Sequence, residues 1–167
     1  MIHAKELRIW QNNIHKNRER NHGVLSDPDM ANYTLLMIQE QYWSDFTRSA
    51  PLHHGWTLYE PNATDDHKPR TAIYTNNKYL PPAKVAQIPM NTPDATTIEI
   101  QTRGGKTTLI INIYNPNNES TVASIKEQLI QMARNTRYDM IIMGGGLQSS
   151  SSTVEPAGIY TNGRKLK

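Results

Sequence analysis

The chain has 167 residues and contains no cysteine, which excludes disulfide frameworks, thiolate zinc sites and cysteine nucleophiles. Its length suits one domain that can bury its own core without staples, and its mean hydropathy is -0.67. No apolar run approaches the length of a membrane span, and the N-terminus lacks the apolar region of a signal peptide. We therefore expect an intracellular protein, cytoplasmic or nuclear, that is not secreted and has no membrane partner.

The formal net charge is +3, and the charges are unevenly distributed. Residues 101–167 hold eight basic and four acidic side chains. A basic final third is compatible with a phosphate-rich partner, although a charge of this size is also ordinary for a soluble domain.

Short apolar runs rich in β-branched residues alternate with Asn, Pro, Gly and Asp, which is typical of strands and turns. We expect strands over residues 7–14, 33–41, 70–76, 95–102, 107–114 and 138–143. The runs at 35–38, 109–113 and 140–143 are nearly continuous in apolar residues and predict strands buried on both faces. The Gly104-Gly105 pair predicts a hairpin turn.

Two segments have helical patterns. Asn118 can cap a helix whose apolar positions share one face; these positions are Val122, Ile125, Leu129 and Met132. A weaker helix is expected over 16–25, ended by the break at Ser26-Asp27-Pro28.

Mixed strands and helices without an internal repeat predict one α/β domain over residues 1–143. After Met143 the sequence becomes rich in Gly and Ser and loses its periodicity. We therefore expect residues 144–167 to form a loosely ordered tail.

Polar residues follow three of the expected strands. Asn13 ends the first strand, Glu40 the second, and Tyr114 and Asn115 the fifth. Polar side chains at the carboxyl ends of buried strands can converge on one cleft, and a carboxylate beside an amide oxygen can hold Mg²⁺. Polar residues end strands in most proteins, so this pattern leaves a structural interpretation open.

Five segments, in order and spacing, resemble the endonuclease/exonuclease/phosphatase family, and more narrowly the apurinic-type endonuclease domain of fungal non-LTR (LINE-like) retrotransposons. The segments are LRIWQNNIHKNRER, YTLLMIQEQYW, RTAIYTNNK, LIINIYNPNNES and YDMIIMGG. The resemblance covers roughly residues 7–144. It implies a four-layered α/β sandwich of two packed sheets flanked by helices, with the last strands missing. It also implies phosphodiester hydrolysis with Mg²⁺ or Mn²⁺, DNA as the partner and no small-molecule cofactor.

The resemblance also assigns roles to individual residues. It implies that Asn13 and Glu40 bind the divalent metal ion, and that Tyr114 contacts the scissile phosphate with Asn115 beside it. Arg70 lies where the related domains carry a basic residue that can meet a phosphate. An ordinary solvated arginine at a strand edge explains Arg70 equally well.

The sequence departs from the family where the family reads Gly-Asp-Phe-Asn. This chain reads Gly144-Gly145-Gly146-Leu147, so Gly145 and Leu147 replace the Asp that activates water and the Asn that stabilises the transition state. The family's Ser-Asp-His motif has no counterpart in these 167 residues. Positioned acid–base groups each contribute about 10²–10⁴-fold in rate.

We therefore expect little or no catalysis and weak binding of Mg²⁺. Two other hypotheses remain open: a non-catalytic nucleic-acid-binding module that uses the same cleft, and a gene fragment without a function.

Other clusters carry less weight. The pair His53-His54 and the run Asp65-Asp66-His67 lack a complete set of metal ligands, and Asp27-Pro28-Asp29 is typical of a turn. Tryptophans can stack on nucleic-acid bases, but tryptophans next to strands are more typical of a core; they are Trp10, Trp43 and Trp56.

Overall fold

Two β-sheets pack face to face in the computed structural model, which describes residues 6–64, 66–102, 104–147, 159–161 and 164–165. The first sheet has the strand order β1-β2-β4-β3, with the bounds Ile9–Asn13, Leu35–Gln39, Thr71–Asn76 and Trp56–Tyr59. The second has the order β10-β9-β8-β7-β6-β5, with the bounds Arg164–Lys165, Ile159–Thr161, Met140–Leu147, Thr107–Asn115, Ala95–Gln101 and Val85–Ile88.

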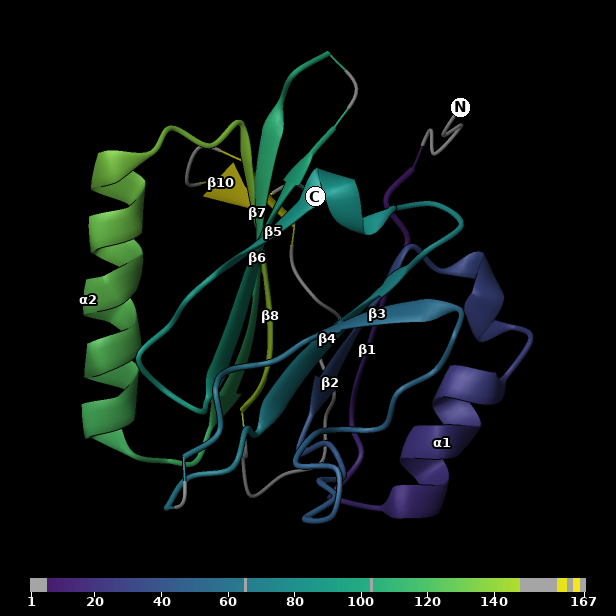
Figure 1. The fold of residues 1–167 in the computed structure, drawn as a ribbon. Helices are drawn as coiled ribbons and strands as arrows, with labels where there is room; N and C mark the ends of the chain where they lie inside the picture. Colours follow the sequence, from purple (N-terminus) through teal and green to yellow (C-terminus); the bar gives the residue numbers. More distant parts are fainter. Residues whose placement is uncertain (1–5, 65, 103, 148–158, 162–163, 166–167) are drawn as a thin grey trace.

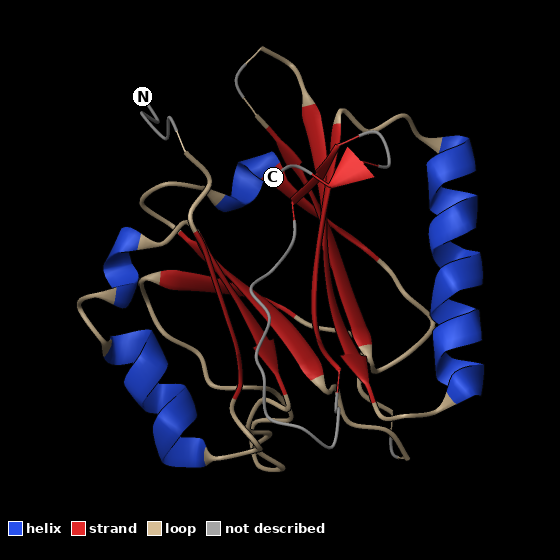
Figure 2. Cartoon of the chain, turned by 180° about the vertical axis from the view of Figure 1, so that it is seen from behind, coloured by secondary structure: helices blue, strands red, loops and turns tan. Residues whose placement is uncertain are grey.

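Helices cover the outer faces of both sheets (Figures 1 and 2). Helix α1, Arg18–Ser26, lies outside the first sheet, and helix α2, Glu119–Asn135, lies outside the second. Two short 3₁₀ helices are Met30–Asn32 (η1) and Pro82–Lys84 (η2). The four layers confirm the expected α/β sandwich. Within the described part of the chain, no helix is long and apolar enough to cross a membrane.

Alternation of side chains along β2 builds two hydrophobic clusters, because successive residues of a strand point to opposite faces. Leu35 and Met37 face the second sheet and pack in the central cluster. Leu36 and Ile38 face the other way and pack toward Leu25 of α1. Strand β2 is therefore buried on both faces, as its continuous apolar run predicted.

A buried amide joins the two sheets. Asn112 of β7 is fully buried, and its Nδ2 donates to the carbonyl oxygens of Ile38 at 2.9 Å and Ala72 at 2.8 Å. Its Oδ1 accepts a hydrogen bond from Nε2 of Gln39. One side chain thus ties the central strand of one sheet to two strands of the other.

Most predicted elements are confirmed with shifted ends. Both helices are present, capped by Asn17 and Asn118, and the Gly104-Gly105 turn joins β6 to β7 with both glycines at positive φ. The sequence missed β3 and β5, which have only four residues each and lie at sheet edges.

The structure corrects two expectations about β8. The strand continues past the expected end at Met143 to Leu147, because hydrogen bonds to the β7 backbone need no side chains. Met143 is 38% exposed, so the prediction that this strand is buried on both faces is wrong. Strands β9 and β10 fall within the expected tail; most of the remainder, including 149–152, lies outside the described residues. The division of the chain at residue 143 stays a prediction.

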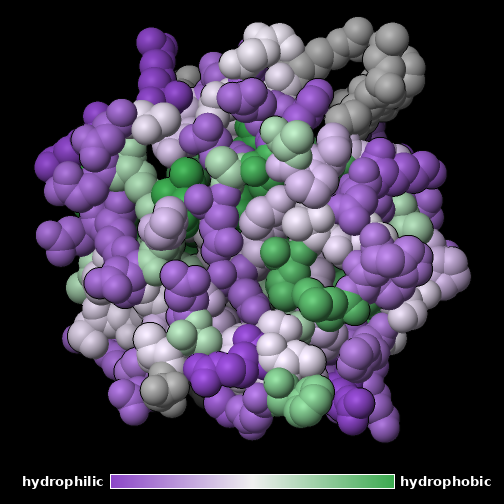
Figure 3. All heavy atoms as spheres, viewed as in Figure 1, coloured by the Kyte–Doolittle hydropathy of each residue, from purple (hydrophilic) through white to green (hydrophobic). Residues whose placement is uncertain are grey.

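The outer face of β7 and β8 is incompletely covered. Ile125 is the residue of α2 that is buried, while Val122 and Ile130 of the same helix are 44% and 41% exposed. An apolar groove of about 520 Å³ runs between α2 and the sheet. The surface seen in Figure 3 is otherwise mostly hydrophilic, with apolar side chains in separate groups.

We predict that Asn112→Ala lowers the free energy of unfolding by about 3 kcal/mol, because it leaves two buried carbonyl groups and the Gln39 amide without partners. Urea denaturation of the variant and the wild type measures this difference. The matched change Asn91→Ala, at an exposed position, should stay within about 0.5 kcal/mol of the wild type. Equal effects at the two positions would contradict the role given to Asn112.

Candidate functional site

The carboxyl ends of β1, β2, β7 and β8 meet at one end of the sandwich, the lower end in Figure 1. Strand β1 runs parallel to β2, and β7 runs parallel to β8. Across the sheets, Nε2 of Gln11 donates to the carbonyl oxygen of Gly145 at 3.0 Å. The residues that follow these strands therefore lie around one region of the surface.

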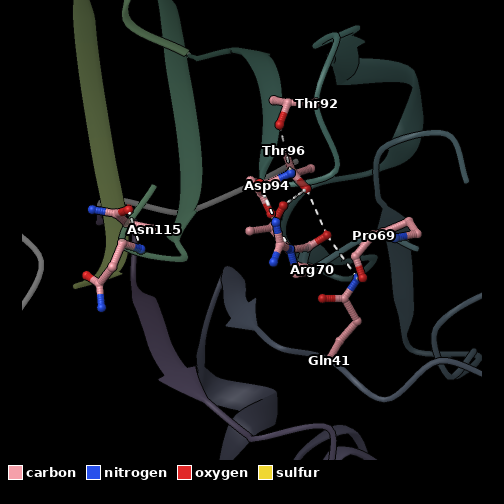
Figure 4. Close-up of polar contacts among 9 residues, drawn as sticks. Gln41, Pro69, Arg70, Thr92, Asp94, Thr96 and Asn115 are labelled. Atoms are coloured by element: carbon pink, nitrogen blue, oxygen red, sulfur yellow. Dashed lines mark hydrogen bonds and ion pairs between the residues drawn. The ribbon is translucent and has the colours of Figure 1, made fainter. Parts of the chain in front are cut away.

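Arg70 and Asp94 form a bidentate ion pair in this region (Figure 4). Nε of Arg70 lies 2.5 Å from Oδ1 of Asp94, and an Nη lies 2.7 Å from Oδ2. The Asp94 side chain is 3% exposed and the Arg70 side chain 35%. Charge-assisted fork geometry of this kind fixes the guanidinium in place, so Arg70 is not a freely solvated side chain at a strand edge.

Tyr114 packs against this ion pair. Its backbone N–H donates to the carbonyl oxygen of Asp94 at 2.8 Å, and the Arg70 guanidinium carbon lies 5.3 Å from the centre of its ring. Burial and the neighbouring Glu40 carboxylate raise the pKa of the Tyr114 hydroxyl to about 12, against an opposing effect of Arg70. The hydroxyl therefore keeps its proton at neutral pH and can donate a hydrogen bond.

Glu40 follows β2 in a left-handed backbone conformation, with φ at +46°. Its N–H donates to the carbonyl oxygen of Arg70 at 2.8 Å, and its carbonyl oxygen accepts from the N–H of Lys16 at 2.6 Å. Such a conformation is costly for a residue with a side chain and persists where surrounding structure enforces it. The strained backbone at Glu40 thus accompanies a carboxylate that lies beside Tyr114.

The two asparagines predicted for the site fix turns at the strand ends. Oδ1 of Asn13 accepts from the N–H of His15 at 2.9 Å, and Oδ1 of Asn115 accepts from the N–H of Asn117 at 2.9 Å. Figure 4 shows Asn115 apart from the Arg70–Asp94 pair. The structure therefore brings Glu40, Arg70 and Tyr114 together and leaves Asn115 outside that group.

Gly145 is the position to which the sequence resemblance assigns the family's aspartate. A Cβ added at this position would lie 2.6 Å from the backbone oxygen of Ile113, which is closer than real contacts allow. Strand β8 would have to shift before any side chain could occupy position 145. Leu147 pairs through its backbone with Asn115 of β7.

The donors available for a metal ion are few. Among the described residues, no group of three or more His, Asp and Glu side chains could hold a metal. Asp94 is committed to Arg70, which leaves Glu40 as the carboxylate and Asn13 as an amide donor. Mg²⁺ is commonly held by one or two carboxylates together with water and substrate phosphates, so the donor set fits a divalent ion that is weakly bound.

Sequence reasoning missed two residues that shape this site. Asp94 directly precedes β6 in a Thr-Pro-Asp turn, and nothing in its spacing linked it to Arg70, 24 residues away. Gln41 is buried, and its Nε2 donates to the carbonyl oxygens of Pro69 at 3.0 Å and Thr71 at 3.1 Å. Gln41 thereby clamps the backbone on both sides of Arg70 (Figure 4).

Two of the lesser candidates, Trp56 and Asp27, have structural roles. Trp56 is buried and its Nε1 donates to the carbonyl oxygen of Leu25 at 3.2 Å, which confirms its prediction as a core residue. Asp27 caps its own turn by accepting from the N–H of Asp29 at 2.8 Å. Asp65 lies outside the described residues.

Glu60 is a half-buried carboxyl group that contacts the Gln41 side chain. Burial raises its pKa to about 7, while contacts with the Ala50 N–H and the Gln41 side chain act in the opposite direction. Oε2 of Glu60 lies 3.3 Å from the Ala50 nitrogen. The folded protein therefore holds a proton on Glu60 more tightly than the unfolded chain does.

We predict that this proton makes stability fall as the pH rises from about 4.5 to about 7, because the native state binds it more tightly across that range. Glu60→Gln should remove this dependence and stabilise the protein at pH 8 by up to about 3 kcal/mol, with little effect at pH 4. Urea denaturation at both pH values measures the difference. Glu127→Gln, on the exposed face of α2, is the control; an equal gain there would contradict the assignment.

Comparison with family models finds no match to this sequence, and comparison with curated proteins finds none. Solved structures do match, and they show that the fold is of the endonuclease/exonuclease/phosphatase type. The chain is similar to the endonuclease domain of TRAS1, a telomere-specific non-LTR retrotransposon, with a TM-score of 0.65 and 21% identity over 87% of this chain and 61% of that one.

Two further matches have the same architecture. SmcL gives a TM-score of 0.57 at 13% identity, over 90% of this chain and 66% of that chain. Truncated TDP2 of Caenorhabditis elegans gives a TM-score of 0.54 at 13% identity, over 87% of this chain and 63% of that chain. The chain spans about three fifths of the length of the TRAS1 domain and of TDP2. At these identities the likeness establishes the fold.

Proposed function

We propose that this chain is a nuclease-fold domain, related to the endonucleases of non-LTR retrotransposons, that binds the phosphate backbone of DNA and hydrolyses it poorly or not at all. The observation that carries the proposal is the contrast between the ends of β2 and β7 and the end of β8. The side chains of Glu40 and Tyr114 interact at the ends of β2 and β7. At the end of β8, position 145 is a glycine, and a Cβ there would lie too close to the backbone oxygen of Ile113.

The side chains present suit phosphate binding. The Tyr114 hydroxyl stays protonated at neutral pH and can donate to a phosphate oxygen. Arg70 uses Nε and one Nη for Asp94, and a guanidinium has five N–H donors, so it can contact an anion while remaining paired. Asn13 and Glu40 would hold a divalent ion, Mg²⁺ or Mn²⁺, which when bound supplies positive charge to the phosphate oxygens.

The residues missing from the site are those that prepare the water molecule. A general base or a water-orienting carboxylate contributes about 10²–10⁴-fold in rate. With Gly145 and Leu147 at the two corresponding positions, Glu40 is the carboxylate that remains. Binding without efficient cleavage follows, in a nuclear or cytoplasmic protein that meets nucleic acid.

We predict that the wild-type chain leaves supercoiled plasmid intact in Mg²⁺ or Mn²⁺, since the water-activating side chain is absent. Agarose gels resolve a single nick per molecule and give a sensitive measurement. The single change Gly145→Asp should not restore nicking, because the backbone of Ile113 obstructs the new side chain. Nicking by the wild type that Glu40→Gln abolishes would show that other residues activate the water, and would overturn the assignment of a defective site.

The binding half of the proposal has its own prediction. Fluorescence anisotropy with a short DNA duplex should show affinity that falls steeply with salt, and Arg70→Gln should reduce the salt slope by about one. Lys84→Gln is the matched control, because η2 lies at the amino end of β5, opposite the carboxyl end of β7. Equal effects of the two changes would indicate binding by overall charge and not by this site.

A further inference from the structure

A histidine that the resemblance does not assign lies directly against the proposed metal carboxylate. Nδ1 of His15 is 3.8 Å from Oε2 of Glu40. The Glu40 side chain is 12% exposed and the His15 side chain 67%. The pair therefore consists of an enclosed carboxylate and an imidazole that is open to solvent on its other side.

The backbone holds these two side chains together at some cost. His15 and Lys16 have φ values of +52° and +56°, and Glu40 has +46°. Left-handed conformations cost a residue with a side chain about 1–3 kcal/mol each. Three successive hydrogen bonds enforce them: His15 N–H to Oδ1 of Asn13, Ile14 N–H to the Gln39 oxygen, and Lys16 N–H to the Glu40 oxygen.

The distance between the two side chains suits an ion better than a direct bond. Hydrogen bonds between nitrogen and oxygen span about 2.7–3.2 Å, and 3.8 Å exceeds that range. Metal ions such as Zn²⁺ lie about 2.0–2.2 Å from imidazole nitrogen and carboxylate oxygen. Two donors on one such ion are then about 3.4 Å apart at a tetrahedral angle and up to about 4.2 Å apart when opposite each other.

From this geometry we infer that His15 Nδ1 and Glu40 Oε2 form a site for a transition-metal ion, whose remaining ligands are water. The inference rests on the proposed function for the Glu40 site and extends it by naming His15 as a ligand. An imidazole donor suits Zn²⁺ and other transition metals, whereas Mg²⁺ prefers oxygen ligands.

Isothermal titration calorimetry without DNA tests the inference. The wild type should bind one Zn²⁺ at this site about 100-fold more tightly than Mg²⁺. His15→Asn should weaken Zn²⁺ binding by about ten-fold or more and leave Mg²⁺ binding unchanged. Asparagine tolerates a left-handed backbone better than other residues with side chains, so the turn is retained. Circular dichroism confirms that the variant is folded.

Two further variants make the outcome decisive. His22→Asn, the same change at an exposed position of α1, should bind Zn²⁺ as the wild type does. Glu40→Gln should weaken the binding of both Zn²⁺ and Mg²⁺. The pair His53 and His54 stays in every variant, so an ion held there cancels from the comparison.

Pulsed electron paramagnetic resonance with Mn²⁺ provides a second readout. The bound ion should show coupling to an imidazole nitrogen in the wild type and lose it in His15→Asn. Absence of this coupling in the wild type, or equal Zn²⁺ affinity in the wild type and His15→Asn, would overturn the inference. If Glu40→Gln alone weakened metal binding, the proposed function would stand and His15 would be only an ion-pair partner.

Discussion

The arrangement of this site depends on the buried Asn112 side chain that joins the two sheets. Its amide donates to the carbonyl oxygens of Ile38 and Ala72 and accepts from Gln39. Because a buried polar group without partners is costly, these bonds fix β7 against β2 and β4 in one register. Glu40 follows directly after Gln39, so the same contact sets the position of the candidate carboxylate relative to Tyr114.

The residues of the candidate site hold one another in place through hydrogen bonds and an ion pair. The Arg70–Asp94 ion pair supports the ring of Tyr114, and the Arg70 carbonyl oxygen accepts from the N–H of Glu40. Gln41 holds the peptide groups on either side of Arg70. Left-handed backbone conformations occur at Glu40 and in the turn after β1, as well as at Arg48 and Asn117. The contacts of Arg70 and Gln41 hold the polar side chains of the candidate site in fixed positions.

The end of β8 is closely packed at the position that the resemblance assigns to the family's aspartate. Gly145 packs so closely on the β7 backbone that no Cβ fits without movement of the strand. The backbone arrangement at this position thus suits glycine. A side chain at position 145 would require changes in the packing of β8 against β7.

The residue patterns alone predicted an α/β domain and most of its strands, because burial imposes apolar runs such as that of β2 and because Asn118 and Gly104-Gly105 mark a helix start and a turn through local chemistry. The four-layered architecture was implied by the family resemblance. The residue patterns also placed Asn13, Glu40 and Tyr114 at strand ends. Only the tertiary structure decided which of these meet, that Asp94 pairs with Arg70, that His15 faces Glu40, and that β8 runs on through its glycines to Leu147. These contacts join residues distant in sequence through register and backbone strain, which no local pattern of residues encodes.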